Sequence, residues 1–212
     1  MQKRHQKRPK IFFHENDLPE WVEFKESVAI DTEAMGLHYG RDRLCLVQLS
    51  FDGENCHIIQ IKKDEYQKSD RLIKLLEDEK VKKIFHFARF DVGLIFSTFG
   101  VLTRNIYCTK IASKLARTYT ERHGLKSVCM ELLGVEISKK EQSSDWGKNN
   151  LTEDQKAYAA SDVLYLHEIM EALNKMLERE GRDRLALEAF NFLPTLAELD
   201  CSGWSESLFA HL

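Results

Sequence analysis

Two acidic residues stand two positions apart at the end of an apolar, β-branched run. Residues 27–33 (Ser-Val-Ala-Ile-Asp-Thr-Glu) are expected to form a buried strand, and strand side chains alternate, so Asp31 and Glu33 share one face. Two like charges held together with little water repel each other, and a divalent cation would relieve that repulsion. Carboxylate oxygens without His or Cys favour hard cations such as Mg²⁺ or Mn²⁺. The alternative is a pair of solvated loop carboxylates.

Two further carboxylates lie in apolar segments that are expected to be helical. Asp91 has aromatic and aliphatic neighbours throughout residues 86–95, and Asp162 follows an Ala-Ala-Ser run. A charge in such surroundings is costly unless it is paired. Arg89 is an alternative partner for Asp91, although residues two apart on a helix do not face each other. Tyr158 precedes Asp162 by four residues, so the two are expected to share a helix face.

The segments around these acids predict an α/β fold with a mixed sheet. An Asp-Gly-Glu-Asn sequence joins two apolar runs and favours a hairpin, and Thr152 with Gln155 matches the capping box that begins a helix. Parallel strands are expected after the hairpin, with helices on both faces. Expected strands are 27–33, 44–51, 56–61, 82–87 and 105–108; expected helices are 71–76, 89–98, 109–116 and most of the chain from 125.

Length and composition fit one globular domain of 212 residues, with 43% hydrophobic and 31% charged residues. No stretch approaches the ~20 apolar residues that span a bilayer, and the polar, basic start lacks the apolar region of a secretory signal. The five cysteines are widely spaced and odd in number, which suggests neither a zinc site nor a disulfide framework and favours the cytoplasm. A net charge of −3 argues against coating of long nucleic acids by charge alone.

The motifs around the four acids resemble those of the DEDD exonuclease superfamily, within the ribonuclease D-like group whose last motif carries tyrosine. The matching segments are 29–37, 85–91 and 158–162, the last preceded by 138–146. Position 157 is alanine, so the histidine of the sister branch is missing. The match runs from about Ile11 to Met176. It implies a 3′–5′ exonuclease domain over 11–180, between a basic flexible tail at 1–10 and a C-terminal helix and tail at 181–212.

Longer matches outside the acidic motifs point to the compact nanoRNase C branch of that group. They cover residues 42–49, 108–115 and 117–125. The resemblance implies an RNase H-like, DnaQ-like fold and a ring-shaped homo-oligomer, an octamer. It also implies hydrolysis of short single-stranded RNA, dinucleotides included, to nucleoside 5′-monophosphates.

The resemblance also assigns roles to the acidic residues and to the tyrosine. Two divalent cations, Mg²⁺ or Mn²⁺, about 4 Å apart would clamp the attacking and leaving oxygens. Asp31 would bridge both ions, Glu33 and Asp162 would complete one site, and Asp91 would help the other through water. Tyr158 would orient the attacking water, because a phenol with a pKa near ~10 is a poor base unless that pKa is shifted.

Expected substrate contacts rest on the same resemblance. Leu37 is an apolar wedge between the last two bases, or a core residue; His86 is a donor to phosphate or ribose, or a satisfied core histidine. Trp146 lines the RNA path or packs in the core. The full set of expected contacts is Leu37, His86, Lys139, Gln142 and Trp146. Arg122 and His123 are further candidates near a 5′ phosphate or a neighbouring subunit.

Several other functions are compatible with parts of the pattern. Trimming of tRNA or other structured RNA is the nearest alternative, but this chain has no room for the extra helical domains of ribonuclease D. Activity on DNA stays open. A degenerate nuclease fold that only binds RNA would be expected to have lost an acid or the tyrosine, and a Ca²⁺-binding structural protein would need a contiguous ligand loop with glycine.

Overall fold

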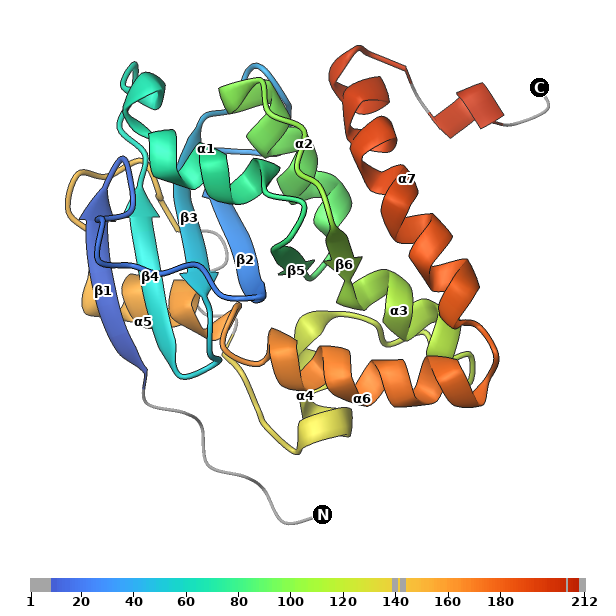
Figure 1. Cartoon of the computed structure of the whole chain (residues 1–212). Coiled ribbons are helices and arrows are strands. Elements are labelled where there is room, and N and C mark those ends of the chain that lie inside the picture. Colours follow the sequence, from blue (N-terminus) through green and yellow to red (C-terminus); the bar gives the residue numbers. More distant parts are fainter. Residues whose placement is uncertain (1–8, 139–140, 142–143, 205, 210–212) are drawn as a thin grey trace.

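A six-stranded sheet forms the centre of the computed structural model, which describes residues 9–138, 141, 144–204 and 206–209 (Figure 1). The strand order across the sheet is β1-β4-β3-β2-β5-β6. The strands are β1 (Lys10–Glu15), β2 (Ser27–Ala34), β3 (Leu44–Ser50), β4 (Asn55–Gln60), β5 (Lys82–Phe85) and β6 (Ile106–Cys108).

The sheet is mixed, which confirms the predicted fold class. β2, β3 and β4 pair antiparallel, whereas β5 pairs parallel with both β2 and β6. Strand β1 was not predicted; it pairs parallel with β4 and forms one edge of the sheet. Its run Lys-Ile-Phe-Phe-His-Glu is short and follows a basic segment without a turn signal, so the sequence pattern alone did not separate it from the N-terminal tail. Lys10, placed in that tail by sequence, is the first residue of β1.

Helices cover both faces of the sheet, and α7 lies beside α2 at its β6 end (Figure 1). Helix α5 lies across β1 and β4 on one face, and α1 and α2 lie on the opposite face. None of the helices in the described part of the chain is both long and apolar enough to cross a membrane. The α-helices are α1 (Asp70–Glu77), α2 (Ala88–Phe99), α3 (Thr109–Ala116), α4 (Leu125–Leu133), α5 (Glu153–Ser161), α6 (Leu166–Arg179) and α7 (Asp183–Cys201), with short 3₁₀ helices at Tyr66–Lys68 and Glu206–Phe209.

The core lies between the sheet and both helix layers. Central strand residues such as Ile30 and Leu46 are fully buried, and β3 is buried along its whole length. A strand covered on both faces loses the apolar–polar alternation of a half-exposed strand, which is why residues 44–50 are almost continuously apolar. All five cysteines are free thiols.

The helix predicted to run through Asp162 is interrupted there, which corrects the sequence interpretation. Helix α5 begins at the predicted capping box of Thr152 and Gln155 and ends at Ser161. Helix α6 begins only at Leu166. Between them, the backbone hydrogen bonds tighten to i→i+3 spacing, from Val163 N–H to the Ala160 carbonyl and from Leu166 N–H to the Val163 carbonyl. Asp162 is therefore the residue that caps α5, not a residue inside a continuous helix.

A histidine pair near the β1 edge should make the folded protein less stable in mild acid. His14 Nε2 and His57 Nδ1 lie 3.0 Å apart, and Phe12 stacks on His57. Burial, with a smaller contribution from the charge of His14, lowers the pKa of His57 from 6.5 to about 4. Between these two pH values the unfolded chain binds a proton that the folded chain excludes, so the free energy of unfolding should decrease as the pH falls from 6.5 to 4. Urea unfolding at pH 7 and pH 5 measures this decrease.

The matched variant for that measurement is His57→Phe, which keeps a stacked ring and removes the titrating group. It should lose less stability than the wild type between pH 7 and pH 5. An equal loss in both proteins would assign the acid sensitivity to other groups.

Candidate metal centre

Three carboxylates from two distant segments converge at the end of strand β2. Asp31 and Glu33 come from β2, and Asp162 comes from the turn that ends α5. One oxygen of each carboxylate lies within 4.8 Å of the others. The strand positions its two acids on one face by alternation, and the pairing of β2 with β3 shifts register between Glu33 and Ala34, where β2 ends.

The electrostatics of this cluster favour a bound cation. Burial raises the pKa of Asp31 and of Glu33, and the charges of Asp31, Asp162 and Asp91 raise the pKa of Glu33 further. Without a counter-charge, the acids can lower their mutual repulsion only by holding protons. A divalent ion would offset the same repulsion and leave the carboxylates ionised. A set of ligands made only of oxygen atoms suits Mg²⁺ or Mn²⁺. The residues present therefore fit the predicted metal.

Asp91 lies beside this cluster but is held from the other face of the sheet. It is buried in the first turn of α2, and its Oδ1 accepts a 2.6 Å hydrogen bond from the Thr32 hydroxyl. Burial and then the charge of Asp31 raise the pKa of Asp91, whereas the Thr32 hydrogen bond lowers it. Thr32 lies between Asp31 and Glu33 in sequence, so alternation points its side chain to the opposite face, toward α2.

The predicted alternative partner of Asp91 is engaged elsewhere. Arg89 donates from Nε and Nη2 to both carboxylate oxygens of Asp200, near the end of α7, at 2.7 Å each. This pair joins α2 to α7.

Tyr158 faces the acidic cluster and packs on Trp146. Their ring centroids are 6.0 Å apart with an interplanar angle of 32°. Burial and then the charges of Asp162, Glu33 and Asp31 raise the pKa of Tyr158, so the phenol keeps its proton at neutral pH. A protonated phenol donates a hydrogen bond, which suits an orienting role better than a basic one.

Three side chains hold the backbone around Trp146. Arg43 donates to the Gly147 carbonyl at 3.3 Å, and Gln155 donates to the Asp145 carbonyl at 3.3 Å. Gln60 donates to the Lys148 carbonyl at 2.9 Å. Trp146 itself is buried, with 3% of its surface exposed, so it packs in the core and also borders the hollow next to Glu33.

Leu37 projects into solvent between two hollows on the protein surface. Its exposed fraction is 77%, so it does not pack in the core. Together with Phe90 it borders a hollow of about 410 Å³ next to Glu33 and another of about 560 Å³ that reaches α7. The loop that carries it closes through Asp42, which accepts from the His38 N–H at 3.0 Å, and Gly36 has no Cβ that would collide with the Asp42 carboxylate.

The other expected substrate contacts are placed differently. The His86 ring is bound to Thr109 Oγ1 through Nδ1 at 2.9 Å, and burial, followed by the charge of Lys110, lowers its pKa to about 3. A neutral histidine held in this way resembles the core alternative more than a cationic phosphate donor. Lys139 and Gln142 lie outside the described residues.

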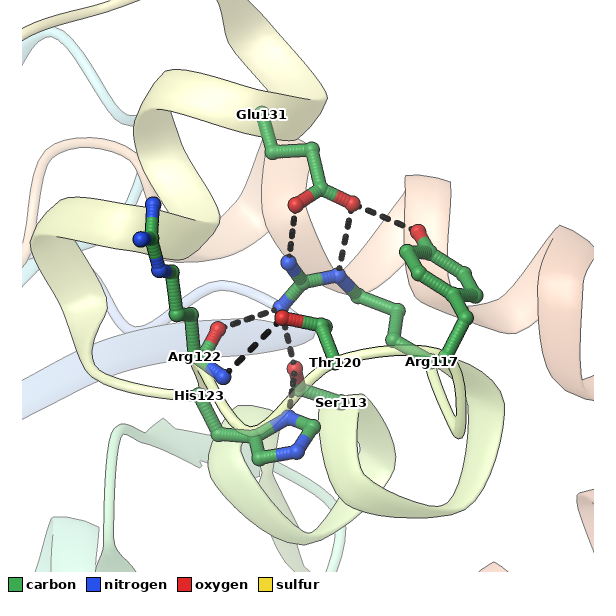
Figure 2. Close-up of polar contacts among 7 residues, drawn as sticks. Ser113, Arg117, Thr120, Arg122, His123 and Glu131 are labelled. Atoms are coloured by element: carbon green, nitrogen blue, oxygen red, sulfur yellow. Dashed lines mark hydrogen bonds and ion pairs between the residues drawn. The ribbon is translucent and has the colours of Figure 1, made fainter.

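Arg122 and His123 belong to a loop that a buried arginine organises (Figure 2). Arg117 donates to the Arg122 carbonyl at 2.9 Å and to Ser113 Oγ at 2.8 Å, and Ser113 Oγ also contacts His123 Nδ1 at 3.0 Å. His123 is thus buried inside the loop, whereas the Arg122 side chain is exposed and points away from the Arg117 guanidinium.

Two residues that contribute to this site were not identified from sequence. Thr32 could have been found, because it lies between two acids of an expected strand and a hydroxyl there must face the opposite layer. Phe90 carried no comparable signal, since its role in the wall between the two hollows depends on how the 36–42 loop folds over α2.

Comparison with known proteins identifies a family that matches most of the chain. The family described as 3′–5′ exonuclease matches residues 9–178. A ribonuclease D from Gluconacetobacter diazotrophicus is 35% identical over 155 residues, which is 73% of this chain and 39% of that protein. This chain therefore spans about two fifths of that relative's length.

Two solved structures of Brucella melitensis NrnC are similar over nearly the full chain. The structure bound to pGG has a TM-score of 0.92 and 51% sequence identity, and covers 97% of this chain and 100% of the other. The structure with bound Mg²⁺ has a TM-score of 0.91 and 51% identity, and covers 96% of this chain and 100% of the other.

Proposed function

This chain belongs to the 3′–5′ exonuclease family, and we propose that it hydrolyses short oligoribonucleotides, down to dinucleotides, to nucleoside 5′-monophosphates. The observation that carries this proposal is the convergence of the Asp31, Glu33 and Asp162 oxygens within 4.8 Å, with Asp91 buried beside them. The preference for short RNA is supported by the similarity to a structure bound to pGG.

The four acids would hold two divalent cations, Mg²⁺ or Mn²⁺. When bound, such ions neutralise phosphate charge and lower the pKa of a water molecule. Asp31 would contact both ions, Glu33 and Asp162 would help to hold one of them, and Asp91 would help to hold the other through water. The Thr32 hydroxyl keeps the Asp91 carboxylate oriented. The similarity to an NrnC structure with bound Mg²⁺ supports the choice of metal.

Tyr158 would orient the attacking water toward the phosphorus with its hydroxyl proton. Trp146 and the three side chains that hold the 145–148 backbone would keep the phenol ring in place. Leu37, with Phe90 behind it, would separate the last two bases into the two hollows. Lys139 and Gln142 remain proposed contacts to RNA, and His86 is proposed to act through its hydrogen bond with Thr109 rather than by contact with phosphate.

The Tyr158→Phe variant should lower turnover by about a hundredfold or more while Mg²⁺ affinity stays within about twofold, since loss of one oriented donor typically costs 10²–10³ in kcat. The variant removes the hydroxyl and keeps the ring that packs on Trp146. Turnover on a dinucleotide and calorimetric Mg²⁺ titration measure the two effects. Near-normal turnover would remove Tyr158 from the mechanism.

The proposed substrate is tested by a digestion series on 5′-labelled RNA of two, five, ten and twenty residues. Mg²⁺ and EDTA arms run in parallel, with Asp31→Ala as the inactive control. We expect metal-dependent release of 5′-monophosphates from the 3′ end, fastest on the shortest RNA. Cleavage that persists in EDTA would contradict the metal-dependent mechanism. A preference for the longest RNA would favour trimming of structured RNA, and matched DNA oligonucleotides test sugar selectivity.

The proposal includes a cytoplasmic, ring-shaped homo-octamer. The ring rests on the resemblance of residues 42–49, 108–115 and 117–125 to the nanoRNase C branch, and the five free thiols suit a reducing compartment. Light scattering after size exclusion measures the mass in solution, and a monomer would contradict the ring.

A further inference from the structure

Gln48 is a fully buried polar residue whose side chain has no hydrogen-bond partner in the described part of the chain. It lies in the middle of β3, with 0% of its surface exposed. Neither Nε2 nor Oε1 of its amide makes a hydrogen bond there. Burial of an amide without a hydrogen bond destabilises the folded protein. A partner that completes this amide is therefore expected in the working enzyme.

The register of the sheet places Gln48 directly opposite Asp31. β2 and β3 pair antiparallel with Asp31 facing Gln48, and directly opposed side chains lie on the same face. Their Cβ atoms are then about 4.5–5.5 Å apart, which is within reach of a glutamine amide.

Of the two residues directly opposite Gln48, only Asp31 carries a side-chain acceptor; Gln60, diagonal to Gln48 on β4, also has an unpartnered Oε1. On the far side, β4 places the apolar Ile58 opposite it. Along its own strand, Leu46 is apolar, and the Ser50 hydroxyl already accepts from the Gly53 N–H at 3.0 Å. Asp31 is thus the directly opposed neighbour with the right chemistry, because a carboxylate accepts what the amide nitrogen donates.

We propose that Gln48 is a positioning residue for the metal centre: its Nε2 donates a hydrogen bond to the Asp31 carboxylate when that carboxylate holds a divalent cation. The bond would orient one oxygen of Asp31 and leave the other toward the ions. Hydrogen bonds of this kind to a metal-ligating carboxylate fix its orientation, and their loss typically costs 10–100-fold in metal affinity or activity. This inference rests on the metal site of the proposed function.

The Gln48→Met variant tests the inference because it preserves side-chain length and removes the amide. In EDTA, its melting temperature should equal or exceed that of the wild type, since an unpartnered buried amide is replaced by an apolar group. Its Mg²⁺ dissociation constant, measured by calorimetry without RNA, should rise by about tenfold or more. Turnover lost at low Mg²⁺ should return as Mg²⁺ is raised.

Two further variants keep the result interpretable. Thr103→Val is the matched control, because Thr103 is also fully buried and its hydroxyl has no partner among the described residues. Thr103 lies in the connection between α2 and β6, so its replacement should not change the Mg²⁺ affinity. Gln48→Asn keeps an amide and withdraws it by one carbon, so it should also weaken Mg²⁺ binding, and it decides the matter if the Met variant does not fold.

The outcomes separate this inference from the proposed function. Wild-type protein that binds Mg²⁺ and cleaves RNA, with unchanged Mg²⁺ affinity in the Gln48 variants, would overturn the role of Gln48 alone. Wild-type protein that binds no Mg²⁺ would overturn both. Weakened affinity in the Gln48 variants, with Thr103→Val unchanged, would support the inference.

Discussion

Replacing Asp31 by asparagine is expected to abolish RNA hydrolysis and to make the metal-free protein more resistant to heat. Asp31 is assigned to both ions, and its loss should lower turnover by at least about a thousandfold, or roughly 4 kcal/mol of transition-state stabilisation. In EDTA the same change removes one of four crowded carboxylates. Burial, followed by the charges of the three other acids, raises the pKa of Glu33. Relief of about 1 kcal/mol would raise the melting temperature by roughly 2–4 °C.

Thermal melts with and without Mg²⁺ measure the second half of this prediction. Mg²⁺ should raise the melting temperature of the wild type, because a ligand bound only to the folded chain stabilises it, and should have little effect on Asp31→Asn. Asp154→Asn is the matched control, since Asp154 is an exposed residue of α5. Two results would contradict the assignment of Asp31 to the ions. One is a metal-free Asp31→Asn protein that melts below the metal-free wild type, and the other is an Asp31→Asn protein that retains a tenth of the wild-type turnover.

The Arg117→Met variant is expected to destabilise the fold by about 3 kcal/mol, the lower end of the range for breaking a buried ion pair. The Arg117 side chain is fully buried and donates to both carboxylate oxygens of Glu131 as well as to Ser113 and the Arg122 carbonyl (Figure 2). Methionine would leave those acceptors without their donor. The lower end of that range of destabilisation applies because the Glu131 side chain is 40% exposed, so water can hydrate it once Arg117 is gone.

Chemical unfolding at pH 7 measures this loss, which corresponds to a decrease in melting temperature of roughly 6–12 °C. Arg179→Met is the matched control because Arg179 pairs with Glu180 at the surface, where its side chain is 68% exposed. Exposed pairs contribute about 0–1 kcal/mol, so the control should change little. Equal effects in the two variants would show that the Arg117 cluster is not a stabilising core element.

The arrangement of the acids along the chain was largely predictable, because it depends on strand alternation and on charges in apolar segments. Asp31 and Glu33 lie on one face of β2 as the period of two requires. Asp162 was predicted inside a helix because Ala, Leu and Tyr at helical spacing give no sign of a break. The turn at 162–165 depends on tertiary packing and i→i+3 hydrogen bonds, which local propensity does not encode.

The contacts around the acids were less predictable than the acids themselves. The Thr32–Asp91 hydrogen bond joins residues 59 positions apart, and the pairing of Gln48 with Asp31 depends on the register of two strands. His86 was expected to contact substrate from its place in a motif, but the Thr109 hydroxyl that holds its ring comes from 23 residues further along the chain. Pairings over such distances require the sheet order, which the sequence pattern did not specify completely.

The position of Asp162 has a consequence for the protein during its synthesis. Three of the four acids lie in the first half of the chain, whereas Asp162 and Tyr158 come from α5 and the turn that ends it. A nascent chain can therefore form β2, β3 and α2 and still lack one metal ligand and the orienting phenol. The complete centre cannot assemble before the chain has been made as far as Asp162 and α5 has docked on the sheet. The proposed nuclease activity thus depends on the docking of α5.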